Sequence, residues 1–166
     1  LRLSPGSPYN GHLLESGPGE AVGWSNGMEV VLAWGEGSGS HTSTYIDDPD
    51  WKVSISSAGN EQLSILSEGE WNNGKWHELI EGAIKFSQMS GLSDEPGRSS
   101  VLESARSAIS RCGMDGLVVP LLCMLGESVV VVPCSLENID LELDGLLSSI
   151  EEEGLSGCIT RVNESS

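Results

Sequence analysis

A tryptophan beside carboxylates is the feature of this sequence best suited to specific chemistry. Trp34 ends an apolar run and enters a Gly-rich segment, with Glu36 two residues later and Asp47 and Asp48 beyond it. An aromatic face attracts a flat cation through the ring quadrupole, and Trp does so most strongly. A carboxylate at the edge of the ligand would accept its hydrogen bonds, as a methylated guanine requires. Two interpretations stay open here, because Trp34 could equally plug the end of a sheet.

Catalysis finds little support in the residue types and their spacing. His12 and His41 lie in segments rich in Gly and Ser, and His77 lies on an expected helix beside Glu78. The sequence contains no Walker loop, His-Glu-x-x-His motif or dinucleotide-binding fingerprint. We therefore expect a non-catalytic binding domain that uses neither a cofactor nor a metal ion.

The net charge and the cysteine content of the sequence indicate which partners and which cellular compartment to expect. The chain has 166 residues and a formal net charge of −17, from 25 acidic and 8 basic residues. This balance repels polyanions and anionic lipid, so we expect no long nucleic-acid tract and no membrane as partner. Four cysteines without a C-x-x-C pair indicate buried free thiols in a reducing, intracellular compartment. Because the chain begins with Leu1, we expect a piece of a larger protein.

The apolar periodicity predicts strands first and then helices with a strand between them. Residues 1–27 are rich in Gly, Pro and Ser and read as an irregular leading arm, which leaves 28–166 as a single domain. The expected strands are 28–34, 51–56, 62–66, 128–132 and 158–162, with a hairpin turn at 58–60. Residues 117–125, which contain Pro120, fit either a strand or a short buried helix.

Three helices are expected from spacing and capping residues. The first starts at Trp76 with Asn73 as cap and ends at Gly91, the second follows a Ser100–Glu103 capping box, and the third covers 141–150. This order predicts an α+β fold, with an antiparallel β-sheet packed on a long helix and additional helices on one face.

Residues 63–88 resemble the strand–turn–helix of a known viral domain. They read Leu63-Ser-Ile-Leu-Ser-Glu-Gly-Glu-Trp-Asn-Asn-Gly-Lys-Trp-His-Glu-Leu-Ile-Glu-Gly-Ala-Ile-Lys-Phe-Ser-Gln88 and end in Phe86-Ser87-Gln88. Upstream, Val31-Leu-Ala-Trp34-Gly-Glu36-Gly37 resembles a strand whose end supplies an aromatic side chain. Over 28–88 the chain is thus similar to the cap-binding domain in the second basic polymerase subunit of orthomyxoviruses.

The resemblance implies that Trp34 and Phe86 sandwich the 7-methylguanine of an RNA cap, with Gln88 near the base. It also implies an acid that reads the guanine edge and a partner lysine, for which the matching positions are Glu36, Asp47 or Asp48, and Lys52. The implied role is capture of capped host RNA for cap-snatching transcription in the host nucleus, with other viral polymerase subunits as partners. Stacking contributes roughly 1–3 kcal/mol per base, so an acidic domain can still hold a capped end.

Two alternatives remain beside cap binding. An acidic protein–protein interaction module would use its Trp residues as core or interface anchors. The viral fold could also persist with a degenerate site that no longer binds a cap. Binding of 7-methylguanosine triphosphate that is lost in Trp34→Ala and Phe86→Ala would single out the first hypothesis.

Overall fold

The helices and strands come from a computed structural model that describes residues 27–36, 45, 47–69, 72–123, 126–137 and 141–162. Apart from Gly27, the expected leading arm 1–27 lies outside the described residues. The elements in chain order are β1 Glu29–Trp34, α3 Pro49–Leu66, α4 Trp76–Met89, α5 Pro96–Arg111, β2 Val118–Leu122, β3 Ser128–Pro133, α6 Leu143–Glu152 and β4 Ser156–Arg161. Two short 3₁₀ turns, η1 Asn73–Lys75 and η2 Leu92–Asp94, flank α4.

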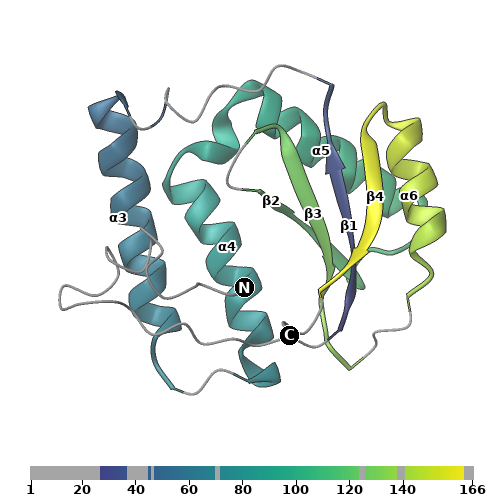
Figure 1. Ribbon diagram of the computed structural model, residues 1–166, viewed down its shortest axis with the longest axis horizontal. Helices are drawn as coiled ribbons and strands as arrows, with labels where there is room; N and C mark the ends of the chain where they lie inside the picture. The colour runs from purple at the N-terminus through teal and green to yellow at the C-terminus, as the bar shows by residue number, and fades with distance from the viewer. Residues whose placement is uncertain are drawn as a thin grey trace.

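The four strands form one antiparallel sheet in the order β2-β3-β1-β4, and Figure 1 shows the helices around it. The path β1–α5–β2–β3–α6–β4 has the β-α-β-β-α-β connectivity of the split βαβ motif. Helices α3 and α4 are inserted between β1 and α5. The predicted α+β class with an antiparallel sheet is confirmed.

Helices cover both faces of the sheet, so the expectation that they gather on one face was wrong. Val31 and Ala33 of β1 belong to a core cluster with α5 and α6. Val30, which points the other way in the strand, belongs to a second cluster with Trp76 and Ile80 of α4. The reason is that β1 is apolar at successive positions, and a strand apolar on both sides needs a cover on both sides.

The predicted hairpin over 51–66 was wrong, because this segment is the 18-residue helix α3. The Asp48 carboxylate caps it by accepting from the backbone N–H of Asp50 at 2.9 Å and of Trp51 at 3.3 Å. Pro49 occupies the first turn, where its missing N–H costs nothing. The buried residues of α3, which are Ala58, Gln62 and Leu66, recur every four positions.

Most other elements were predicted correctly, with shifted ends. Helix α5 begins at Pro96, so Ser100 lies inside the helix and the predicted capping box was wrong. Asn72, one residue before the predicted cap, accepts from the backbone of Gly74 at the start of η1. Residues 118–122 form a strand, which settles the open interpretation of 117–125.

The four cysteines are free, but none is buried, so that part of the expectation was wrong. Cys112 and Cys158 are exposed, and Cys123 and Cys134 are half-buried. Burial raises the pKa of the Cys123 thiol, although a hydrogen bond with Ser128 and the charge of Arg98 act in the opposite direction.

Candidate functional site

Trp34 lies at the end of β1 on the α4 side of the sheet, opposite Ser128 of β3 and Ser156 of β4. Its side chain is 41% exposed, although it belongs to a central strand. The ring therefore does not serve as a buried plug, and it offers an apolar surface beside β4.

Phe86 is half-buried. A Cβ atom added to Gly59 of α3 would lie 3.7 Å from Phe86 Cε2, which places the ring between α3 and α4. Ile84, which packs toward the sheet, is about 200° away around the helix. Within the described part of the chain, no contact brings the rings of Phe86 and Trp34 together, so the aromatic sandwich stays a prediction.

The remaining predicted site residues lie on different elements. Glu36 is exposed just after β1, Asp47 is exposed before α3, and Lys52 is exposed on the first turns of α3. The Asp48 carboxylate already caps α3. Gln88 is the predicted residue that lines a concave site.

That concave site is a groove of about 260 Å³ beside β2. Helix α4, η2, helix α5 and the strand itself contribute to its walls. Its polar lining includes Gln88, Asp94 and Arg106, and Leu102 and Leu121 are among its apolar residues. Sequence analysis missed Asp94 and Arg106, since only the topology brings η2 and α5 to one edge of the sheet.

The two outer strands of the sheet differ in how their edges are protected. Cys123 N–H donates to Ser128 O at 2.9 Å, and Cys134 N–H donates to Leu117 O at 2.8 Å. Because hydrogen-bonded pairs alternate along an antiparallel ladder, the backbone groups of residues 118, 120 and 122 point outward from β2. Pro120 therefore has no N–H to offer at this edge, and proline is a common guard against unwanted strand pairing.

The edge of β4 carries no such guard. Val162 N–H donates to Met28 O at 2.8 Å, which fixes the phase of the β1–β4 ladder. The backbone groups of Gly157, Ile159 and Arg161 consequently point outward. The strand sequence Ser-Gly-Cys-Ile-Thr-Arg contains neither proline nor lysine. Figure 1 shows β4 at the margin of the sheet, with α6 beside it.

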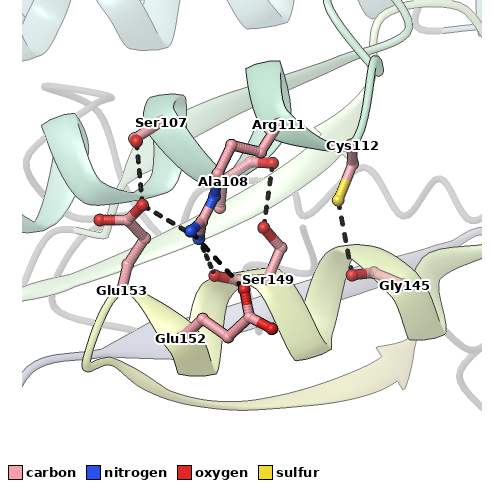
Figure 2. A network of polar contacts seen from close by, with 8 residues as sticks. All are labelled: Ser107, Ala108, Arg111, Cys112, Gly145, Ser149, Glu152 and Glu153. Atoms are coloured by element: carbon pink, nitrogen blue, oxygen red, sulfur yellow. Dashed lines mark hydrogen bonds and ion pairs between the residues drawn. The ribbon is translucent and has the colours of Figure 1, made fainter.

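A polar network holds α6 against α5 and so fixes the surroundings of β4 (Figure 2). Arg111 donates to Ser149 O at 2.8 Å and lies 3.0 Å from a Glu153 carboxylate oxygen. The same carboxylate accepts from Ser107 Oγ at 2.9 Å. Ser149 Oγ in turn donates to Ala108 O at 3.4 Å. These contacts join the last turn of α5 to the last turn of α6.

A second network surrounds Arg98, which is only 2% exposed. Its Nε lies 3.0 Å from Glu95 Oε2, and its Nη1 donates to Cys123 O at 3.1 Å. The guanidinium carbon lies 5.5 Å from the ring centre of Tyr45, whose hydroxyl donates to Glu95. A charge so enclosed and partnered supports the structure, because it ties the start of α5 to the end of β2.

Over the described ranges, no cluster of three or more His, Cys, Asp or Glu side chains has the arrangement to hold a metal ion. The same ranges contain no helix with the length and apolar character needed to cross a membrane.

Comparison with known proteins gave no match to a family model, to a curated protein or to a solved structure.

Proposed function

We propose that this domain is a non-catalytic protein-interaction module in which β4 accepts an extended, basic segment of a partner as an additional strand. The observation that carries the proposal is the unequal protection of the two sheet edges. The outward positions of β2 include a proline, whereas those of β4 are Gly157, Ile159 and Arg161, which retain their N–H groups. Strand addition uses such backbone groups for affinity.

The surface beside β4 supports the same interpretation. On the α4 side, Cys158 and Thr160 are exposed, and the exposed ring of Trp34 lies on β1 opposite Ser156, at the start of β4. Helix α4 packs mainly over the β2 and β3 half of the sheet, where Val119 and Val130 join its cluster, and it reaches the start of β1 at Met28 and Val30, at the opposite end of that strand from Trp34. An added strand would place every second side chain on the same face of the sheet as Trp34, and the one level with Ser156 would lie about 10 Å from β1, within reach of a long side chain. Exposed Trp is a frequent anchor of interfaces.

The negative charge around β4 favours a basic segment as the added strand. Helix α6, which packs against β4, contains Asp144, Glu151 and Glu152 and no Lys or Arg. With a net charge of −17 on the chain, a basic segment gains from the long-range field. A second copy of this chain would bring the same negative charge, so a basic partner protein fits better than self-association.

A fluorescein-labelled peptide of alternating Lys and Val tests the proposal by fluorescence anisotropy. We expect binding that weakens with added salt, since exposed charges are screened within about 10 Å at 0.1 M ionic strength. When one backbone nitrogen of the peptide is methylated at a time, binding should be lost for every second position and kept for the positions between, because only alternate N–H groups face β4. Equal sensitivity at all positions, or no binding at low salt, would contradict the proposal.

Arg161→Pro and Arg161→Gln form a matched pair of variants. Both remove the charge and its 2.8 Å contact with Glu29, but only the proline removes the outward N–H. We expect Arg161→Pro to bind the peptide more weakly than Arg161→Gln, and Trp34→Ala to bind it more weakly than the parent. Equal affinity of the two Arg161 variants would refute strand addition. If the parent chain dimerised and only Arg161→Pro blocked the dimer, the β4 edge would bind a second copy of this chain. The proposal of a basic partner protein would then be wrong.

A further inference from the structure

The groove beside β2 is large enough for a ligand smaller than a drug-sized molecule, and its lining is part apolar and part polar. Its volume of about 260 Å³ lies just below the range of roughly 300–1,000 Å³ that drug-sized ligands occupy. Ile84 of α4, Leu102 of α5 and Leu121 of β2 supply apolar surface, and Gln88 lies among the polar residues of the lining. The expected occupant is therefore smaller than a nucleotide and partly apolar.

The backbone of β2 adds hydrogen-bonding groups to this groove. Pro120 and Leu122 both line it, and their backbone groups point away from β3. Pro120 offers a carbonyl oxygen without a competing N–H, while Leu122 offers both an N–H and a carbonyl. Proline thus disfavours an added strand here but leaves acceptors and one donor for a small ligand.

A positive and a negative side chain line the same groove. Arg106 of α5 and Asp94 of η2 have no ion-pair partner within the described part of the chain. Carboxylate partners lie within 4.0 Å of five other basic residues, which are Lys75, Lys85, Arg98, Arg111 and Arg161. Among the seven basic residues that the structure describes, Arg106 and Lys52 have no carboxylate partner, and of these two Arg106 lines the groove. Arg106 is therefore available to an external carboxylate, and Asp94 to an external cation.

We propose that this groove binds a free α-amino acid with an apolar side chain of moderate size. The ligand carboxylate pairs with the Arg106 guanidinium and accepts from the Leu122 N–H. The ligand ammonium pairs with Asp94 and donates to the Pro120 carbonyl. The ligand side chain lies against Ile84 and Leu102. This site is separate from the β4 edge, so its test does not depend on the proposed partner binding.

Isothermal titration calorimetry of the whole chain against a panel of L-amino acids tests the inference. We expect an apolar member of the panel to bind at millimolar concentration or better. Arg106→Gln and Asp94→Asn should each weaken binding at least about tenfold, because each removes a charge-assisted contact. The control Glu103→Gln changes an exposed charge on the same helix as Arg106 but outside the groove, and should leave affinity within about twofold.

Analogues of the bound amino acid assign each end of the ligand. Its N-acetyl form should bind equally to the parent and to Asp94→Asn, and its amide should bind equally to the parent and to Arg106→Gln. Absence of binding across the panel would overturn the inference, as would equal affinity of the parent and the two groove variants. A peptide ending in the same residue that binds more tightly than the free amino acid would also overturn it, because the groove would then read a chain terminus.

Discussion

Substitution of Gly157 by alanine tests how closely β4 is held between α6 and β1. A Cβ atom at this position would lie 2.9 Å from Leu147 Cδ1 and 2.9 Å from Leu32 O. The leucine side chain can rotate, but the carbonyl belongs to β1, whose register with β4 is fixed by hydrogen bonds. Overpacking of this kind costs about 1–3 kcal/mol. For a chain of this length, a loss of about 2 kcal/mol lowers Tm by roughly 4–8 °C.

Gly145→Ala is the matched control because it makes the same chemical change in α6. Nothing lies within 4 Å of a Cβ atom added there, and the position is helical. Alanine should therefore stabilise the fold by about 0.5–1 kcal/mol. Urea unfolding followed by far-ultraviolet circular dichroism measures both variants. If Gly157→Ala were as stable as Gly145→Ala, the close contact between β4 and its neighbours would be wrong.

Four further predictions address the buried charge, the thiols and the cap hypothesis. Arg98→Met should cost about 1–3 kcal/mol in urea unfolding, because it leaves Cys123 O without its donor and the half-buried Glu95 without its cationic partner; a loss below about 0.5 kcal/mol would contradict the structural role. Iodoacetamide should modify exposed Cys158 well before Cys123, whose raised pKa keeps the thiol neutral, and equal rates by mass spectrometry would contradict this. The raised pKa of Cys123 means that the folded state favours the neutral thiol. The contribution of Cys123 to the free energy of unfolding should therefore fall as the pH rises from the ordinary thiol pKa toward the raised pKa of the folded protein. Tryptophan fluorescence should show no change with 7-methylguanosine triphosphate that depends on Phe86, because that ring faces α3; quenching lost in Phe86→Ala would instead support the cap sandwich.

The strands β1, β3 and β4 could be predicted because each is a short run that carries its own signal, whereas the run that contains β2 fitted either a strand or a short helix until the structure showed a strand. The run at β3 contains consecutive valines, and the run at β1 is bounded by glycines. The two faces of β1 could not be assigned, since both are apolar and only the inserted α4 decides which cluster each residue joins. Local composition therefore predicts where a strand lies in the sequence. Which helices cover each face of that strand depends on the topology of the whole fold.

Helix α3 shows why alternation misled the prediction. Trp51, Val53 and Ile55 alternate with polar residues, and Gly59 lies where a hairpin turn would be. In the helix, Val53 is exposed, so its apolar character carries no information about the core. The stronger signal was the Asp48 cap followed by proline, which marks a helix start and is rare at the start of a hairpin strand.

The α3–α4 insertion decides which parts of the sheet remain available for binding. Helix α4 covers the β2 and β3 half of its face and reaches the start of β1 at Met28 and Val30, and together with α5 it encloses the outer edge of β2 in a groove. The other half, where Trp34 and β4 lie, keeps an exposed ring and an edge without proline. A small ligand suits the enclosed edge because only a few backbone groups are free there, whereas an extended chain suits the open edge because its outward groups continue along the strand. The same sheet thus presents two sites of different size, and their separation follows from where the inserted helices pack.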